Sequence, residues 1–282
     1  MGEALSTFYS KGNLNTMKNV TLYHHGPSTC SQKVRIILEL KNISYESKII
    51  DLLAGEQHAP EYVKLNPNHL VPTLVTDDGV LIESSVINEY LDDNFPGIPA
   101  KPSDPFNIAK MRLWVKYIDV YHPQCGSITY GIGMRNILIQ KPKDELDQEI
   151  ASIPDLIKRK NRRDLVDMGL DAPVLIEALK QTEVLLDKLE QELENSDWLF
   201  NNSFGIADAA TLPYIIRMEQ LALGELFSST KRPNINNWYE RIKNMDIFEN
   251  AVTSYIPEAL IGVLTKFGND QKDKIFKIME KK

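Results

Sequence analysis

A short segment near the N-terminus carries the residue types that thiol chemistry needs. Ser28 and Cys30 follow a Gly26-Pro27 break, and the apolar spacing after them predicts a helix from Ser28 to Lys41. A helix N-terminus presents free N–H groups and a partial positive charge, so a thiolate placed there is stabilised and the thiol pKa falls. The Ser28 hydroxyl can add a hydrogen bond to the sulfur. The same residues also fit an ordinary helix cap at Ser28 and a small buried apolar side chain at Cys30.

Three further features suit the ends of a short peptide. Pro72 lies at the start of a predicted strand, and a cis Val71–Pro72 bond would turn the Val71 backbone outward to pair with an extended ligand. Ser84 begins a predicted helix, where it can hold a carboxylate, and Glu83 beside it can hold an ammonium group. His69 can pair with a second carboxylate. Each feature alone is more often structural, but together with the Ser28 helix they suit γ-Glu-Cys-Gly, which is glutathione.

The pattern around these residues predicts a small α/β domain over residues 18–97. A parallel βαβ unit followed by a hairpin gives a mixed sheet that is covered by helices, in the order βαβαββα. The hairpin turn at Asp77-Asp78-Gly79 is the strongest local signal. The predicted elements are a strand at 20–24, a helix at 28–41, a strand at 45–51, a short helix at 60–65, strands at 73–76 and 80–82, and a helix at 84–95.

The rest of the chain is predicted to be helical. A proline-rich linker over 98–105 leads into an all-α domain over 106–260 and a helical tail over 261–282. Residues 1–17 read as a loose extension, so translation from Met17 is an alternative start. The polar segment 141–173 is expected to be an insertion with weak helical content.

Composition excludes several other classes of protein. The 282 residues are 43% apolar and 25% charged, with a formal net charge of −7, which indicates a globular protein and argues against binding to nucleic acid or an anionic membrane. No apolar run is long enough to span a membrane. Two distant cysteines fit a reducing compartment, and five scattered histidines predict no metal site.

The motifs resemble those of the glutathione transferase superfamily over about residues 20–255. The segments that carry the likeness are YHHGPSTCSQKVRI, LNPNHLVPTLV, DDGVLIESSVINEYLDDNFP, SDPFNIAKMRLWVKYID and FGIADAATLP. The resemblance implies a thioredoxin-like N-terminal domain and an all-α C-terminal domain. It further implies a cytoplasmic, homodimeric enzyme of detoxification, with glutathione as co-substrate, a small hydrophobic electrophile as its partner and no metal.

The resemblance also implies roles for individual residues. Ser28 falls where the serine-type classes keep their catalytic hydroxyl, and Cys30 where the bacterial beta class keeps its cysteine. His24 stands in place of the tyrosine of the tyrosine-type classes, which argues against tyrosine activation. The glutathione ligands implied by position are His69 for the glycyl carboxylate, Val71 with Pro72 for the backbone, and Glu83 with Ser84 for the γ-glutamyl group.

Two departures from the family pattern concern the helical domain. Gly205 occupies the capping position that is normally Ser or Thr, with Asp208 three residues later. The long stretch 125–173 resembles that of bacterial β-etherase-type transferases and, more loosely, of ganglioside-induced differentiation-associated proteins, which suggests an ether substrate. An electrophile site between the domains is expected to be lined by Tyr117, Tyr121, Cys125, Tyr130 and Met134.

Two alternatives to a serine-type transferase stay open at this stage. One is a glutathione-dependent thiol reductase that uses Cys30. The other is a non-catalytic interaction module with the same fold, because fold alone does not settle function.

Overall fold

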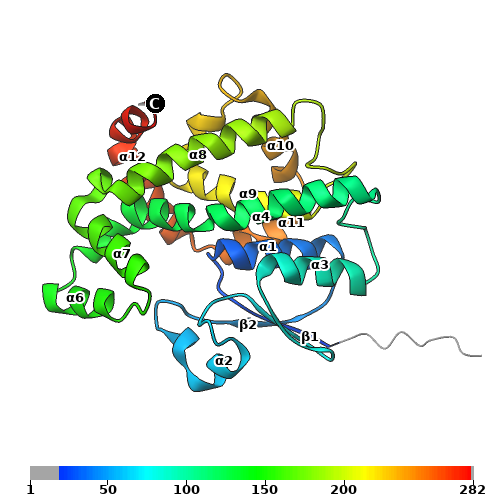
Figure 1. The fold of residues 1–282 in the computed structure, drawn as a ribbon, viewed down its shortest axis with the longest axis horizontal. Helices are drawn as coiled ribbons and strands as arrows, with labels where there is room; N and C mark the ends of the chain where they lie inside the picture. Colours follow the sequence, from blue (N-terminus) through cyan, green and yellow to red (C-terminus); the bar gives the residue numbers. More distant parts are fainter. Residues whose placement is uncertain (1–18, 281–282) are drawn as a thin grey trace, which may run out of the picture.

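The computed structural model describes residues 19–280, which form a mixed sheet and a larger helical domain (Figure 1). The predicted extension over 1–17 lies outside these residues. The sheet has the strand order β2-β1-β3-β4, in which β1 and β2 are parallel and the other neighbours are antiparallel. The N-terminal elements are β1 (Val20–His24), α1 (Thr29–Leu40), β2 (Glu46–Ile49), a 3₁₀ turn η1 (Glu56–His58), α2 (Pro60–Leu65), β3 (Thr73–Thr76), β4 (Gly79–Ile82) and α3 (Ser84–Asn94).

Local sequence signals explain most of this domain. The hairpin pairs Thr73 with Ile82, and its turn includes Gly79 with a φ of 134°, a conformation that glycine adopts without a steric penalty. Pro60 occupies the first turn of α2, where a missing N–H costs nothing. Figure 1 shows α1 and α3 on the side of the sheet that faces the helical domain and α2 on the opposite side. The predicted thioredoxin-like βαβαββα order is confirmed.

The helical domain is built around α4 and α9. Its elements are α4 (Pro105–Ile128), a π-helical segment η2 (Thr129–Met134), α5 (Arg135–Leu138), α6 (Lys143–Ala151), α7 (Leu156–Met168), η3 (Gly169–Asp171), α8 (Pro173–Glu192), α9 (Ile206–Gln220), η4 (Gly224–Phe227), α10 (Pro233–Lys243), α11 (Asp246–Ala251), η5 (Thr253–Tyr255) and α12 (Glu258–Met279). Nearly every residue of α9 is buried, because α1, α3, α4 and α12 all pack against it. One apolar core runs through both domains.

One expectation for this domain is wrong. The segment 141–173 is largely helical, since it forms α6, α7 and η3. Leu146 and Ile150 of α6 pack with Val166 of α7 in a small separate core, which stabilises helices that propensity alone leaves marginal. The predicted boundary between a domain ending at 260 and a tail starting at 261 falls inside α12. That helix belongs to the domain, because Gly268 packs directly on the Leu221 backbone.

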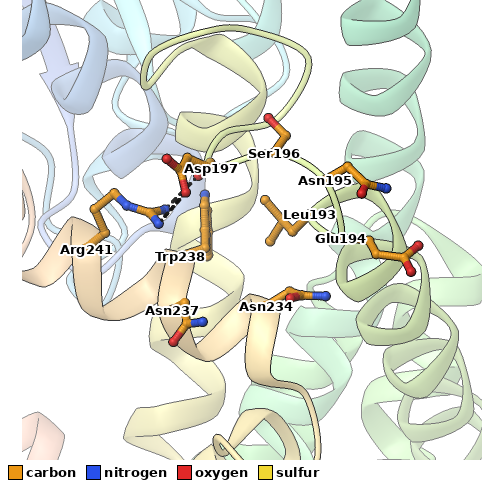
Figure 2. Close-up of a pocket in the computed structure, with 9 residues that line it drawn as sticks. All are labelled: Leu193, Glu194, Asn195, Ser196, Asp197, Asn234, Asn237, Trp238 and Arg241. Carbon is orange, nitrogen blue, oxygen red and sulfur yellow. Dashed lines mark hydrogen bonds and ion pairs between the residues drawn. The ribbon is translucent and has the colours of Figure 1, made fainter.

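A polar surface cavity of about 370 Å³ lies between the end of α8 and α10 (Figure 2). Trp238 and Arg241 of α10 line it, and the Arg241 guanidinium pairs with Asp197 at 2.6 Å. The loop after α8 supplies the other wall. None of the residues predicted to handle glutathione lines this cavity.

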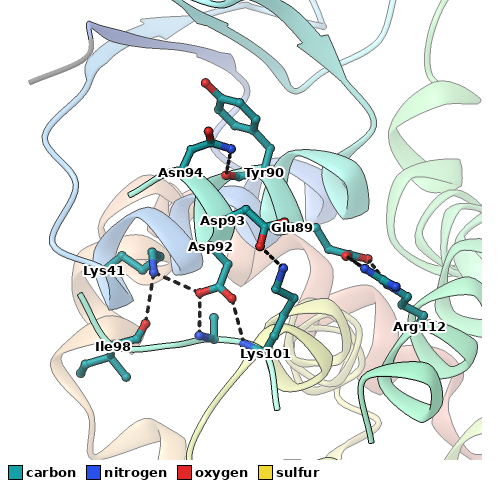
Figure 3. Close-up of polar contacts among 10 residues, drawn as sticks. Lys41, Glu89, Tyr90, Asp92, Asp93, Asn94, Ile98, Lys101 and Arg112 are labelled. Carbon is teal, nitrogen blue, oxygen red and sulfur yellow. Dashed lines mark hydrogen bonds and ion pairs between the residues drawn. The ribbon is translucent and has the colours of Figure 1, made fainter. Parts of the chain in front are cut away.

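Asp92 at the end of α3 joins the linker to the N-terminal domain (Figure 3). Its Oδ1 accepts hydrogen bonds from Lys41 Nζ at 3.0 Å and from the Ala100 amide at 2.7 Å, and Oδ2 accepts one from the Lys101 amide at 3.2 Å. Both side chains of the Lys41–Asp92 pair are buried, so the pair fixes where the linker enters the helical domain. Among residues 19–280, no helix has the length and apolar character needed to span a membrane.

Candidate functional site

Ser28 is the N-cap of α1. Its Oγ accepts a hydrogen bond from the Ser31 amide at 3.3 Å, and its backbone is extended, as an N-cap requires. Because this bond uses only a lone pair, the hydroxyl hydrogen stays free to be donated to a ligand. The side chain is half-buried, and the first turn of α1 has no acidic residue. The structure therefore places a hydroxyl donor at the positive end of a three-turn helix.

Cys30 lies two residues further along, in the first turn of α1, and meets the helical domain. Its Sγ is 3.7 Å from Nδ1 and 3.8 Å from Nε2 of His122 on α4. His122 Nδ1 is also 3.1 Å from the Tyr214 hydroxyl. Burial alone would raise the pKa of the Cys30 thiol, but the hydrogen bond and charge of His122, with smaller contributions from Lys33 and Ser84, hold it below the ordinary value.

His122 was missed by the sequence reasoning. It comes 92 positions after Cys30, on a helix of the other domain, and no local spacing links the two residues. The only signal in the sequence is that His122 is a histidine within the long helix α4. The pair matters because it gives Cys30 the features of a reactive thiol.

Ser84 is buried at the first position of α3, and Glu83 before it is exposed with a φ of 71°. Ser84 lies close enough to Cys30 to lower the pKa of its thiol, so the N-terminal ends of α1 and α3 lie near each other. The predicted ammonium and carboxylate ligands thus stand next to the predicted thiol site.

The Val71–Pro72 bond is cis. Three buried side chains support the segment before it. Leu70 O accepts hydrogen bonds from the Tyr62 hydroxyl at 2.5 Å and from Asn66 Nδ2 at 2.8 Å, and both of these side chains also contact the Thr73 hydroxyl. This network holds the backbone at the entry to β3.

His69 lies two residues before the cis bond, with a φ of 57°. Its Nδ1 is 3.1 Å from Nδ1 of His58, a second residue that the sequence reasoning missed. His58 Nε2 in turn lies 3.2 Å from the Gln57 side-chain nitrogen, which can only donate. Nε2 of His58 therefore accepts, His58 Nδ1 donates to His69, and His69 keeps its Nε2–H for a carboxylate.

The comparisons with known proteins decide the family. The N-terminal domain model of glutathione S-transferase matches residues 27–94, and the C-terminal domain model of glutathione S-transferase matches residues 158–246. A curated relative, Protein LigF of a Sphingobium species, is 30% identical over 226 residues, which are 78% of this chain and 88% of the relative. The chain belongs to the glutathione S-transferase family.

Other relatives of this glutathione S-transferase agree. A tetrachloro-p-hydroquinone reductive dehalogenase from Sphingobium chlorophenolicum is 29% identical over 83% of this chain and 96% of the relative. The crystal structure of the β-etherase LigF from Sphingobium sp. strain SYK-6 superposes with a TM-score of 0.73 at 28% identity, over 83% of this chain and 98% of that one. Glutathione transferase F7 of Populus trichocarpa, at 23% identity and a TM-score of 0.63 over 82% of this chain and 97% of that one, shares the fold.

The five residues expected to line an electrophile site fall into two groups, with Tyr117, Tyr121 and Cys125 along α4 and with Tyr130 and Met134 against the small core of α6 and α7. Tyr121 and Cys125 are buried on the inner face of α4, where the Tyr121 hydroxyl lies 2.8 Å from the Thr182 hydroxyl. Burial raises the pKa of the Cys125 thiol. These two residues are packing residues in this structure, because the apolar period of α4 turns them into the core.

The other three expected residues face different neighbours. Tyr117 lines a separate cavity of about 350 Å³ between α4 and α8. Tyr130 stacks under the Arg162 guanidinium at 3.2 Å from the ring centre, and Tyr130 and Met134 both pack against the small core of α6 and α7. These residues therefore meet different neighbours, and a shared electrophile lining stays a prediction.

His24 has a structural role. Its Nδ1 lies 3.0 Å from Arg35 Nη1, which can only donate, and its Nε2 contacts Ser47 at 2.7 Å. Burial and the neighbouring charge of Arg35 lower the pKa of His24 to about 4, so the ring is neutral near pH 7. Across the described part of the chain, no group of three or more His, Cys, Asp or Glu side chains is arranged to hold a metal ion.

Proposed function

We propose that this glutathione S-transferase binds glutathione along the α1, β3 and α3 edge and that Ser28 activates its thiol. The observation that carries the proposal is the free hydroxyl hydrogen of Ser28 at the N-terminus of α1, beside the buried Ser84. In this arrangement the Val71 backbone pairs with the cysteinyl residue, Glu83 and Ser84 hold the γ-glutamyl end, and His69 holds the glycyl carboxylate. The cis Val71–Pro72 bond supports the backbone pairing.

Thiol activation is the chemical task of this site. A cysteine-like thiol with a pKa of about 8.5 is only a few per cent ionised at neutral pH, and lowering the pKa by about two units makes most of it thiolate. A helix terminus and one hydroxyl donor stabilise the thiolate over the thiol. The sulfur then attacks a small hydrophobic electrophile and displaces a leaving group.

We expect glutathione binding to depend on Glu83. The Glu83→Gln variant removes the negative charge that faces the ligand ammonium, and its affinity should fall about tenfold, since hydrogen bonds to charged groups contribute about 1.5–3 kcal/mol. Titration calorimetry with reduced glutathione measures this change. Glu89→Gln, on the helix that follows Glu83 and paired with Arg112, is the matched control and should bind as the wild type does. No heat with the wild type would refute glutathione binding and favour an interaction module.

An ether is the electrophile class that the relatives support. The name of the Sphingobium structure describes a β-etherase, and that of the dehalogenase describes reductive removal of chlorine from an aromatic ring. Aromatic substrates with a leaving group next to an activated carbon are therefore the class to test first. The proposal assigns no individual substrate.

A second candidate function is a thiol reductase that uses Cys30. The contact with His122 favours it, because a neighbouring imidazole stabilises a thiolate. In such a reaction the Cys30 thiolate attacks the glutathione sulfur of a mixed disulfide, which forms a Cys30–glutathione disulfide, breaks the original S–S bond and releases the other partner as a thiolate.

The reactivity of Cys30 can be measured directly. Because its pKa is lowered, alkylation by iodoacetamide should reach half its maximal rate at a lower pH for Cys30 than for Cys125, whose pKa is raised. His122→Ala removes the main group that lowers the Cys30 pKa, so the midpoint should rise. Peptide mass spectrometry at each pH gives both curves. Identical midpoints for the two cysteines would remove the basis for the reductase.

We also propose, from the family, that the protein is a homodimer, that it is located in the cytoplasm and that it acts in detoxification. For the dimer, exposed apolar side chains on neighbouring elements offer a surface, namely Val80 on β4, Val86 on α3, and Phe106, Leu113 and Val120 on α4.

A further inference from the structure

The turn immediately before Ser28 is held by two buried arginines. Arg35 of α1 donates from Nη2 to Gly26 O at 2.9 Å and from Nη1 to His25 O at 3.4 Å. Arg217 of α9 donates from Nη2 to Pro27 O at 2.8 Å. Three consecutive carbonyl groups thus meet guanidinium donors, and one of the two donors comes from the other domain.

The acceptors of Arg217 are all neutral, as are those of Arg35. Its side chain donates from Nη1 to the Thr129 hydroxyl at 3.1 Å and from Nε to Gln220 Oε1 at 3.0 Å, in addition to Pro27 O. No carboxylate of residues 19–280 lies within ion-pair distance of it. Only 8% of Arg217 is exposed, so solvent screens little of its charge.

Two other buried cations are neutralised by carboxylates, whereas Arg35 meets only neutral acceptors, as Arg217 does. Lys33 pairs with Asp119 at 3.1 Å, and Arg232 pairs with Asp187 at 2.7 Å and with Glu183. A buried charge without a partner is costly, and removing that cost requires an anion nearby. A thiolate bound at the end of α1 is such an anion.

The charge of Arg217 also reaches one sulfur atom of this region, that of Cys125. It lowers the pKa of the Cys125 thiol, although burial raises that pKa overall. Burial in turn lowers the pKa of Arg217 itself. Other titratable groups lie around the turn. Tyr45, Tyr255, His24 and His25 lie near Arg35, Asp51 lies near His25, and Lys33 and His122 lie near Cys30.

We propose that Arg217 is a positioning residue for thiol activation, which holds the Pro27 carbonyl behind Ser28 and supplies a buried counter-charge for the bound thiolate. Holding this carbonyl offsets its partial negative charge next to the N-terminus of α1, where that charge would oppose the helix dipole. Through Arg217, the helical domain lowers the thiol pKa of glutathione that is bound to the N-terminal domain. The inference rests on the proposed binding of glutathione.

The test compares glutathione with S-methylglutathione, which has no ionisable thiol. For Arg217→Gln, the pKa of the bound thiol should rise by about one unit, because a nearby cation that favours the thiolate is lost. The ultraviolet absorbance of the thiolate, followed against pH, measures this pKa. Binding of S-methylglutathione should change by less than about twofold, because its sulfur carries no charge. Arg217→Lys keeps the charge and should show a smaller rise.

Arg232→Gln is the matched control. It removes a buried arginine of the same domain that does not contact the turn, and the bound thiol pKa should stay at the wild-type value. An unchanged thiol pKa in Arg217→Gln, or an equal loss of affinity for both ligands, would overturn the role of Arg217. A wild type that binds glutathione without any thiolate absorbance would instead overturn the proposed thiol activation and this inference with it.

Discussion

Replacing Ser28 by alanine is expected to lower kcat/KM for glutathione conjugation by roughly 10- to 100-fold, because one hydrogen bond to a charged acceptor contributes about 1.5–3 kcal/mol. The Ser28 Oγ already accepts the Ser31 amide, so its single hydrogen is the group that meets the thiolate. The loss should appear in the thiol pKa as well as in the rate. Initial rates with an activated aryl halide, at saturating glutathione and across a pH series, measure both effects.

The Ser28→Ala change also removes a helix cap, and a second variant separates the two effects. Glycine at an N-cap costs only a few tenths of a kcal/mol relative to serine, whereas alanine costs about 1 kcal/mol. Ser28→Gly should therefore fold with near wild-type stability yet lose as much activity as Ser28→Ala. Cys30→Ala should keep its transferase activity. Full activity in Ser28→Gly, or a loss confined to Cys30→Ala, would transfer the mechanism to Cys30.

Elements that begin or end at a proline or at a glycine turn could be predicted closely from the sequence. The Asp77-Asp78-Gly79 turn determines the hairpin, and Pro60 marks the start of α2 at the predicted residue. Both signals act through backbone conformation within a few residues, so no tertiary information is needed. The α6 and α7 region was not predicted as helical, although Asp155 and Gly169 cap α7, because its few apolar residues give no clear period and its helices depend on contacts that form only after folding.

The residues of the candidate site also fall into those with a local sequence signal and those that only the tertiary structure brings close. The residues of the N-terminal domain were predicted because each lies at an element boundary that a sequence pattern reveals. His122 and Arg217 were not, because both approach the Ser28 region from helices of the other domain. The period of α4 correctly groups Tyr121 with Cys125 on one face, but periodicity alone does not distinguish a face in the core from a face in a binding site.

Gly205 shows how a departure from a family pattern can have a local cause. A Cβ at this position would lie 2.5 Å from Ala100 O, which already accepts the Ile206 amide at 2.9 Å. The linker passes too close for any side chain, so glycine is required there. The capping role then passes to Asp208, whose Oδ2 accepts the Gly205 amide at 2.9 Å.

Replacing Asp208 by alanine is expected to lower the free energy of unfolding by about 3–5 kcal/mol, because each buried donor left unpaired costs about 1–3 kcal/mol. The carboxylate is fully buried and accepts the Gly205 amide, the Leu199 amide at 3.1 Å and Trp238 Nε1 at 2.8 Å. The Trp238 contact ties the start of α9 to α10, so the change loosens the packing of both helices. Urea unfolding followed by tryptophan fluorescence measures the loss.

The matched control for this prediction is Asp197→Ala. Asp197 pairs with Arg241 on the surface of the same region, and an exposed pair contributes about 0–1 kcal/mol. Equal unfolding midpoints for the two variants would contradict the assignment of Asp208 as the buried cap of α9. Because α9 also carries Arg217, a loosened α9 should displace the guanidinium from Pro27 O. Asp208→Ala should therefore lose thiol activation at temperatures where the chain is still folded, whereas Asp197→Ala should keep it.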